Sequence, residues 1–378
     1  MSPASAPSAE TRAPTYRLKK NVPVPYTQNL PDIVRRNIGH WAGRKYHGAG
    51  IIEHISDTGD HLFTVKAGAT PNARFSTETL RKFAEIADVH GLGSLRFTRS
   101  GSIEILAGSL EQALAAKKAV EGIGFHVGGW GRTLWAVNAC TSYLTCTTAV
   151  VDAPSITKAL YDQMVPYFTG EIPLPAKLRI NVAGCPTACG GLVADIMLAG
   201  HYGAAPSYDP ERIRLCLPSN AKVLSHVVPE VQMVCPVNAI ESFARPDGSI
   251  GINIIEKKCI GCGRCKDVCD HITWDPSKIG VSVLIGGKSS NTGVGPTLAR
   301  VLVPWIPVRP PQYREPVAVV RKIIDVWRAG AQPGERLADY VNRVGMKTVF
   351  EALKVPVGLW NRPAELNTGF GVREFLPR

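Results

Sequence analysis

The sequence predicts an α+β fold in which a small sheet layer precedes a region rich in candidate metal ligands. Two observations predict it. Strand-like and helix-like patterns alternate through the first third of the chain, and all ten cysteines lie between Cys140 and Cys269. Strands with helices gathered on one face form an α+β layer. Clustered cysteines in a chain without an export signal indicate metal binding, because disulfides are rare in the cytoplasm.

The early elements follow from hydrophobic periodicity and capping residues. Ser76 or Thr77 is placed to cap a helix whose apolar residues recur at three- and four-residue spacing, and Gly91 ends it. The other predicted elements of this region are a short helix near 32–36, a half-buried strand over 61–66, a hairpin over 94–98 and 102–107, and an Ala-rich helix over 110–121. Residues 15–50 are otherwise basic and rich in Pro and Gly.

Length and charge narrow the class of protein. The chain has 378 residues, enough for two or three domains, and its 43 Lys and Arg against 31 Asp and Glu give a net charge of +12. This excess indicates an anionic partner. The aromatic residues do not alternate with Lys and Arg as in nucleic-acid modules, so no nucleic acid is expected. No apolar run is long enough for a membrane span, and the N-terminus resembles no export signal, which predicts a cytoplasmic protein.

Two pairs of cysteines in the middle of the chain have spacings that suit an iron–sulfur cluster. These residues, called here the core cysteine site, are Cys140, Cys146, Cys185 and Cys189. Thiolates on two turns rich in Gly, Thr and Pro can surround a [4Fe–4S] cluster, which needs four sulfur ligands. Spacing alone leaves a structural zinc ion and buried cysteines without a ligand as alternatives, although C-x5-C is a long gap for zinc.

A second group follows the bacterial ferredoxin spacing C-x2-C-x2-C-x3-C over residues 259–269. The first three thiolates of such a run bind one cluster, and a remote Cys-Pro pair supplies the fourth ligand. Cys235-Pro236 is available upstream. The predicted ferredoxin-type site therefore consists of Cys235, Cys259, Cys262 and Cys265. The alternative takes Cys269 as the fourth ligand and leaves Cys235 free. Cys216 has no partner at a ligand spacing and is predicted to be a buried, unpaired residue.

The core spacings C-x5-C and C-x3-C resemble the signature of siroheme-dependent sulfite and nitrite reductases. The resemblance implies a [4Fe–4S] cluster at the core cysteine site, with Cys189 also the axial ligand of the siroheme iron. Over residues 20–375 the chain resembles the beta subunits of dissimilatory sulfite reductases. This implies one sulfite/nitrite-reductase-type half (a ferredoxin-like sheet module plus a siroheme domain) with an inserted bacterial-type 4Fe-4S ferredoxin domain. It also implies a heterotetramer of two alpha and two beta subunits.

The resemblance further implies roles for basic and polar residues. Lys177 and Arg179 match the strand that points cations at siroheme carboxylates and the substrate oxyanion, and are assigned as catalytic. From residue type alone they would suit a solvated strand face. Cofactor binding is assigned to residues near the family's arginine-bearing strand, before the core site and in the glycine-rich loop after the ferredoxin insert: Arg96, Arg99, Arg132, Lys288 and Asn291.

Two positions depart from the family pattern. Ser100 stands where a second arginine is expected, and Trp135 stands where catalytic halves tend to have arginine. The resemblance therefore implies that an alpha subunit supplies the missing cations. It also implies three other partners, namely sulfite, an electron donor and a small cysteine-tailed sulfur-carrier protein.

The predicted organisation has six parts. They are a flexible tail (1–20), a ferredoxin-like α+β module (21–125), a siroheme/4Fe-4S domain in two parts (126–207 and 279–330), the inserted ferredoxin domain (208–278) and a C-terminal helical segment (331–378). Amphipathic helices are predicted over 316–329 and 336–344 and near 348–353. The predicted function is the six-electron interconversion of sulfite and sulfide at siroheme coupled to one cluster, with the second cluster as a relay. The alternatives are a siroheme nitrite reductase and an iron–sulfur electron-transfer protein without a tetrapyrrole.

Overall fold

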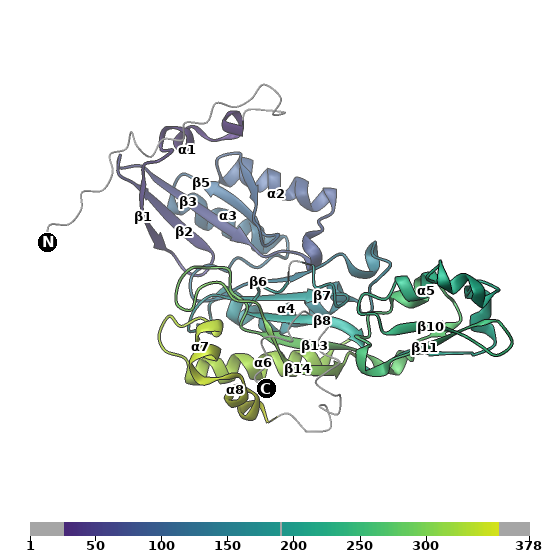
Figure 1. The fold of residues 1–378 in the computed structure, drawn as a ribbon. Coiled ribbons are helices and arrows are strands. Elements are labelled where there is room, and N and C mark those ends of the chain that lie inside the picture. Colours follow the sequence, from purple (N-terminus) through teal and green to yellow (C-terminus); the bar gives the residue numbers. More distant parts are fainter. Residues whose placement is uncertain (1–25, 190, 355–378) are drawn as a thin grey trace. The chain divides into compact units, whose positions relative to one another are not determined.

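The structure is a computed structural model that describes residues 26–189 and 191–354 (Figure 1). The chain forms two compact units. Unit 1 contains the residues up to Ala136 and Met164–Lys177, and unit 2 contains Val137–Gln163 and the residues from Leu178 onward. The predicted tail (1–20) and the part of the predicted C-terminal segment beyond residue 354 lie outside the described residues. Within the described ranges, no helix has both the length and the apolar character that crossing a membrane requires.

Unit 1 is an antiparallel sheet with two helices packed on one face. The strand order is β1-β2-β3-β5-β4. The strands are β1 (Trp41–Tyr46), β2 (Ile51–Ser56), β3 (His61–Ala67), β4 (Leu95–Phe97) and β5 (Ile103–Ala107), and the helices are α1 (Asp32–Arg36), α2 (Thr77–His90) and α3 (Leu110–Gly122). Phe83 of α2, Val120 of α3 and Ile105 of β5 belong to one buried core. Ser76 and Ser109 cap the two helices by accepting a backbone N–H.

Periodicity and capping predict most of unit 1 correctly. The predicted helices near 32–36, from 76 or 77 to 91 and over 110–121 are confirmed, as are the strand over 61–66 and the hairpin over 94–107. The prediction misses β2 and, beside it, the strand β1. This strand lies at the edge of the sheet and is exposed along nearly its whole length, so it has no apolar face for a sequence pattern to reveal.

Unit 2 is built on a second five-stranded sheet, with the order β14-β13-β8-β7-β6. β7 and β8 are parallel, whereas β8, β13 and β14 are antiparallel neighbours. The strands are β6 (Leu134–Ala139), β7 (Leu178–Ala183), β8 (Ile196–Tyr202), β13 (Ile279–Ile285) and β14 (Arg300–Pro307). Because β8 is fully buried and β13 almost fully, these two strands form the centre of the sheet.

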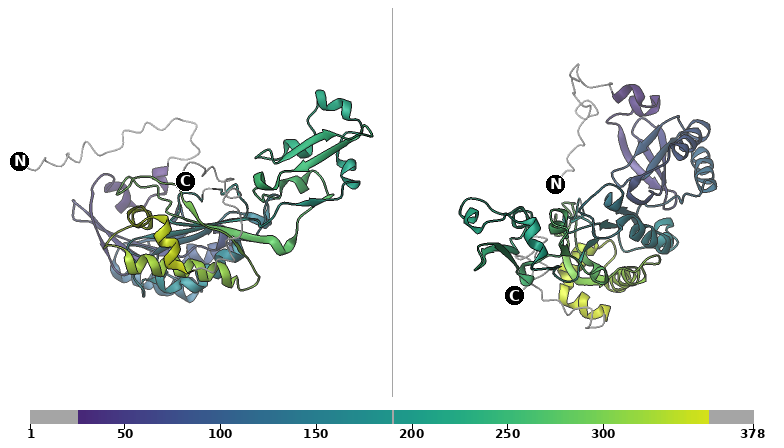
Figure 2. Two further views of the ribbon diagram at one scale, coloured as in Figure 1. Left: turned by 60° about the horizontal axis from the view of Figure 1, so that its bottom comes forward. Right: turned by 90° about the vertical axis from the view of Figure 1, so that its right-hand side faces the viewer.

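Helices cover this sheet, and a buried ion pair joins the start of one of them to it. They are α4 (Ala153–Thr169), α6 (Arg314–Gly330), α7 (Leu337–Val344) and α8 (Met346–Leu353), so the three predicted C-terminal helices are confirmed. Figure 2 shows α6, α7 and α8 (yellow-green) together, and α6 packs against β14. Arg336, just before α7, donates to Asp195 Oδ1 through Nη2 (2.6 Å) and Nε (3.1 Å), and Asp195 Oδ2 accepts the Arg179 N–H. Both charges are buried, so each depends on the other.

A small set of elements between β8 and β13 has its own core. It contains β9 (Ser207–Tyr208), α5 (Glu230–Met233), β10 (Ile240–Ala244), β11 (Ile250–Ile254) and β12 (Ile272–Thr273). β9 pairs with β12, and β10 pairs with β11. Ile213, Val231 and Ile252 form an apolar cluster that also includes Cys265. Short strands and turns, rather than long helices, therefore position the second group of cysteines.

Candidate iron–sulfur and cofactor sites

The core cysteine site lies where two neighbouring strands of the unit 2 sheet end. Cys140 follows β6 directly, and Cys185 stands two positions after β7. Hydrogen bonds join the two ends. The Cys140 N–H donates to Val182 O (3.1 Å), and the Gly184 N–H donates to the Cys140 sulfur (3.1 Å). The sheet therefore brings together two cysteines that are far apart in the sequence.

The other two core cysteines reach the same place through turns. Thr148 Oγ1 lies 3.2 Å from the Cys146 sulfur and 3.7 Å from the Cys185 sulfur. Burial raises the pKa of the Cys140 thiol, the Gly184 N–H opposes this rise, and the nearby Cys189 and Cys185 add to it. The structure thus gathers all four residues of the predicted core set.

Ser142 holds this part of the chain rigidly. Its buried Oγ donates to Val151 O (2.5 Å) and accepts from Ala153 N–H (3.2 Å). A Cβ atom at position 184 would lie 2.8 Å from that Oγ, so any side chain there would displace Ser142. Four thiols on rigid strand-end turns, with a backbone N–H directed at one sulfur, fit a [4Fe–4S] cluster.

The ferredoxin-type site belongs to the segment that lies between β8 and β13 in the sequence, and its cysteines surround a hollow. Its volume is about 340 Å³, including space open to solvent, and most of its wall is apolar. All four predicted ligands line it: Cys235, Cys259, Cys262 and Cys265. Burial raises the pKa of Cys265 to about 12 and also raises that of Cys262. Thiolates are costly in such surroundings unless a metal cluster supplies compensating positive charge.

The fourth position of this site is filled by Cys235 in the structure. The Ala239 N–H donates to its sulfur (3.1 Å), and the side chain lines the hollow with those of the C-x2-C-x2-C run. Gly261 and Gly263 take left-handed φ angles of 66° and 79°, which let the run turn tightly around the hollow. Among the described residues, no three His, Cys, Asp or Glu side chains lie close enough to hold one single metal ion.

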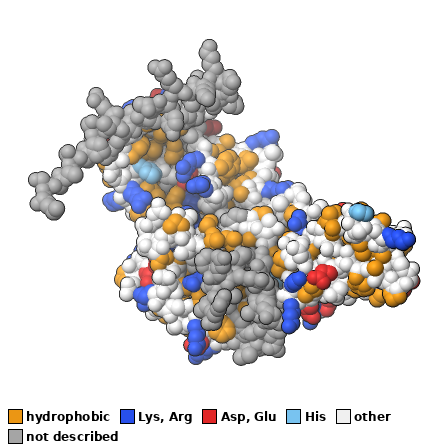
Figure 3. All heavy atoms as spheres, viewed as in Figure 1, with side chains coloured by type: hydrophobic (Ala, Val, Ile, Leu, Met, Phe, Trp, Pro, Cys, Tyr) orange, Lys and Arg blue, Asp and Glu red, His pale blue; other side chains and the backbone are white. Residues whose placement is uncertain are grey.

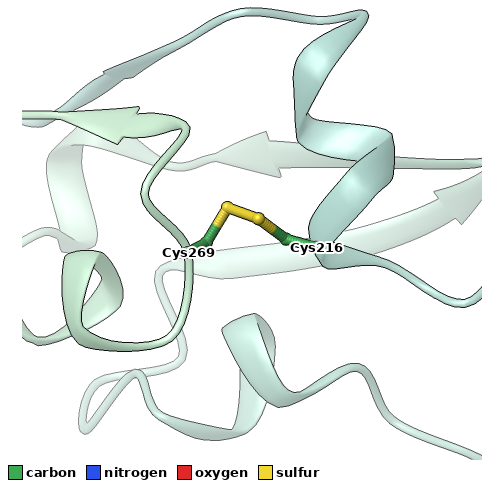
Figure 4. The surroundings of a disulfide bond; sticks show 2 residues. All are labelled: Cys216 and Cys269. Carbon is green, nitrogen blue, oxygen red and sulfur yellow. A yellow bond between two sulfur atoms is a disulfide. The ribbon is translucent and has the colours of Figure 1, made fainter.

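Cys269 forms a disulfide with Cys216, 53 residues away, with the two Cα atoms 5.6 Å apart (Figure 4). The prediction that Cys216 is a buried residue without a partner is therefore wrong. The pairing joins two segments through tertiary structure, so no local spacing reveals it. Cys269 does not line the hollow in this arrangement, whereas Cys235 does.

All three predicted cofactor-binding arginines lie in unit 1, as does Lys177. The Arg96 Nε donates to Glu104 Oε2 (2.5 Å), and the Arg132 Nε donates to Leu174 O (3.0 Å). Arg99 is exposed on the turn between β4 and β5. The Lys177 Nζ lies 4.7 Å from the centre of the Trp135 ring, a cation–π distance. The ammonium group of Lys177 thus lies against Trp135, the residue that departs from the family pattern.

The remaining predicted residues lie in unit 2. Arg179, on β7, is half-buried, and its backbone N–H is bound by Asp195 (2.8 Å). Asn291 is exposed in the glycine-rich loop. Lys288 of the same loop is completely buried, and its Nζ donates to Asp339 Oδ1 (2.7 Å) and to Thr292 O. The Lys288 charge therefore stabilises the loop from inside.

Sequence reasoning missed a broad hollow in unit 1. It lies on the sheet face opposite α2 and α3 and has a volume of about 1450 Å³, including space open to solvent. Polar wall residues include Arg44, His54, Arg96 and Glu104. Over the elements of unit 1, Figure 3 shows Lys and Arg side chains (blue) among apolar ones (orange). Alternating polar residues on β2 and β5, such as His54 and Glu104, are the sequence signal that could have revealed this face.

Two groups in this hollow are electrostatically unusual. Burial lowers the pKa of His54, Glu104 opposes this effect, and the His54 Nε2 lies 2.8 Å from Thr64 Oγ1. Glu104 is only 2% exposed, and its Oε1 has no hydrogen-bond partner in the structure. The wall thus contains two guanidinium groups, of which that of Arg96 is paired with Glu104.

Two family profiles match the chain. The sequence profile of the nitrite and sulphite reductase 4Fe-4S domain matches residues 130–359, and that of the nitrite/sulfite reductase ferredoxin-like half domain matches residues 54–122. Fold and cysteine arrangement thus define the class, the nitrite and sulfite reductases. The crystal structure of dissimilatory sulfite reductase I shares the fold, with a TM-score of 0.66, 20% identity and coverage of 84% of this chain and 78% of that chain.

Relatives by sequence narrow the class. The dissimilatory-type sulfite reductase subunit beta of Archaeoglobus fulgidus is 31% identical, covering 86% of this chain and 88% of that protein. The beta subunit of Nitratidesulfovibrio vulgaris is 29% identical, covering 87% and 86%. The alpha subunit of Allochromatium vinosum is also similar, at 22% identity, covering 84% and 78%. The chain belongs to the family of dissimilatory sulfite reductase beta subunits.

Proposed function

We propose that the chain is the beta-type subunit of a dissimilatory sulfite reductase that holds siroheme and two [4Fe–4S] clusters. The observation that carries the proposal is that one chain gathers two separate sets of four cysteines. One set lies at the strand ends of the unit 2 sheet, and the other lines a hollow of about 340 Å³. Membership of the beta-subunit family favours sulfite over nitrite as the substrate.

Each set of cysteines has its own role in this proposal. Cys140, Cys146, Cys185 and Cys189 would hold the core cluster, and Cys189 would also hold the siroheme. When bound, siroheme coupled to a cluster would supply several electrons for the reduction of sulfite. The ferredoxin-type site holds the relay cluster in a hollow whose wall is mainly apolar.

Basic residues of the chain bind the anionic groups. Arg44 and Arg96 line the unit 1 hollow, where guanidinium groups pair well with carboxylates of a tetrapyrrole. Arg99, Arg132 and Asn291 are exposed and add donors for the same ligand. Lys177, directly before β7, and Arg179, the second residue of β7, orient the sulfite oxyanion. Lys288 acts indirectly by fixing the glycine-rich loop through Asp339.

An alpha-type subunit completes the enzyme in an alpha2beta2 assembly. The ferredoxin-like half domain matches this chain once, over residues 54–122, and Trp135 and Ser100 occupy positions where arginines are expected. The alpha subunit supplies those cations, an electron donor reduces the relay cluster, and a small cysteine-tailed carrier protein takes up the reduced sulfur. Similarity to a named alpha subunit supports this pairing of homologous chains.

The first test uses protein produced together with the alpha-type subunit and purified without oxygen. We expect the Soret and red absorption bands of an isobacteriochlorin and about nine irons per beta chain, four for each cubane and one for siroheme. Sulfite and nitrite turnover are compared with one artificial donor. Iron–sulfur absorption without tetrapyrrole bands would identify an electron-transfer protein instead, and preferential turnover of nitrite would identify a nitrite reductase.

The second test concerns the partner. The beta chain produced alone is compared with the co-produced complex for siroheme content and sulfite turnover. We expect the isolated chain to be depleted of siroheme and inactive. Full siroheme loading and a full turnover rate of the isolated chain would show that no second subunit contributes to the site.

A further inference from the structure

A tryptophan in the wall of the ferredoxin-type site has an unused hydrogen-bond donor. The Nε1 atom of Trp274 is buried and has no hydrogen-bond partner in the structure. The indole packs against two apolar clusters, one of which contains Cys265 and the other Cys259, and it lines the hollow that the four cysteines surround. A buried N–H without an acceptor is unfavourable, and an acceptor on a ligand bound in the hollow would relieve that cost.

Cys265 lies in the apolar cluster against which Trp274 packs, and both residues line the hollow. Because Nε1 is buried and has no acceptor in the protein, its N–H remains available to a ligand that fills the hollow.

Tyr202 holds the indole in this orientation. The two rings are stacked with their centres 4.3 Å apart and an angle of 28° between their planes. Tyr202 ends β8, is only 6% exposed, and its backbone N–H donates to Gly261 O (2.8 Å) within the cysteine run. A side chain at Gly261 would clash with the Tyr202 backbone, with a Cβ only 2.2 Å from its O. The buried sheet thus fixes the position of Trp274 relative to the cysteines.

We propose that Trp274 sets the reduction potential of the relay cluster by donating its indole N–H to a sulfur of that cluster, with Tyr202 as the positioning residue. The inference rests on the proposed function, because it assumes a [4Fe–4S] cluster at the ferredoxin-type site. A reduced cluster carries one more negative charge than an oxidised one. A donor directed at its sulfurs therefore stabilises the reduced form and raises the potential.

The test is an EPR-monitored redox titration of the co-produced holoenzyme. Trp274→Phe keeps an aromatic ring for the Tyr202 stack but removes the N–H, and we expect the midpoint potential of the relay cluster to become more negative. Trp305→Phe is the matched control, because its buried Nε1 is also unpaired and it does not line the hollow. Its relay potential should equal that of the unchanged protein.

Tyr202 is tested in the same titration. Tyr202→Phe keeps the stack and should leave the relay potential unchanged, whereas Tyr202→Leu removes it and should shift the potential in the direction of Trp274→Phe. A relay potential in Trp274→Phe equal to that of the unchanged protein would overturn the proposal.

A measurement on the unaltered sequence covers the case in which a variant loses its cluster. In holoenzyme labelled with ¹⁵N-tryptophan, pulsed EPR of the reduced relay cluster should show a ¹⁵N coupling, and its proton coupling should disappear in D2O. Absence of both couplings would also overturn the proposal. Absence of any relay-cluster signal that depends on Cys259 would instead contradict the proposed function, so the two failures are distinguishable.

Discussion

The two cysteine sites of this chain use the same ligand type in different surroundings. At the core site, strand ends hold the thiols, and a backbone N–H and the Thr148 hydroxyl lie at sulfur atoms. At the ferredoxin-type site, short turns hold the thiols around a hollow with a mainly apolar wall. Hydrogen bonds to sulfur and exclusion of water are two means by which a protein sets cluster potentials. One chain thus offers two sites whose potentials are set separately.

The means of holding the ligands also differ. The core site depends on the order of strands in a buried sheet, and the ion pair between Asp195 and Arg336 fastens that sheet to α7. The ferredoxin-type site lies in a segment with a small core of its own, which a disulfide cross-links. Each site should therefore lose or keep its cluster independently of the other.

The largest expected effect is that of Cys189→Ser. This residue is the proposed bridge to siroheme, so the variant should lose siroheme coupling, about four irons and sulfite turnover. The ferredoxin-type cluster should remain, as seen in EPR spectra of the reduced protein. The matched control, Cys265→Ser, should show the reverse loss. A normal siroheme spectrum and normal turnover in Cys189→Ser would refute the assignment.

Loss of one cluster is expected from Cys235→Ala. Its sulfur lines the hollow and accepts the Ala239 N–H, whereas Cys269 is bound in a disulfide. Iron content should fall by about four irons per chain in Cys235→Ala and stay unchanged in Cys269→Ala. The opposite pattern would show that the disulfide is absent from the mature protein and that Cys269 is the ligand.

How far the sequence predicts these sites depends on whether local spacing carries the information. The C-x2-C-x2-C run identifies three ligands, and helix caps such as Ser76 identify unit 1 elements, because both are local patterns. The pairing of Cys216 with Cys269 and the burial of Lys288 against Asp339 arise from residues distant in sequence. The sequence shows the types of these residues but not the contacts that decide their roles.

The hollow of unit 1 shows the same limit. Arg44 and His54 come from β1 and β2, and only the antiparallel pairing of the strands brings them to one face with Arg96. The family resemblance predicts Arg96 and Arg99 as cofactor-binding residues from one strand motif, and it predicts no such residue on β1. An exposed edge strand has no apolar pattern, so its contribution becomes apparent only in the folded sheet.

A smaller effect is expected from removing the disulfide. Cross-linking residues 53 positions apart lowers the entropy of the unfolded segment, and the chain-entropy estimate gives a stabilisation of about 4 kcal/mol. In Cys216→Ser/Cys269→Ser, the ferredoxin-type EPR signal should disappear at a lower denaturant concentration, while the core cluster signal keeps its midpoint. A reducing agent that does not attack the clusters should mimic the change in the unaltered protein and have no effect in the variant. Equal midpoints for the ferredoxin-type signal would argue against a stabilising cross-link.

The smallest effect should come from Thr148→Val, which removes one hydroxyl and keeps the shape of the side chain. Once the cysteines are thiolate ligands, this hydroxyl donates to Cys146 (3.2 Å) and lies near Cys185 (3.7 Å), so it favours the reduced core cluster. Its loss should make the core potential slightly more negative without changing the ferredoxin-type potential. Thr145→Val is the control, because its hydroxyl is paired with Thr141. A shift of both potentials together would show that the two environments are coupled, whereas a shift of the core potential alone would show that each site sets its own.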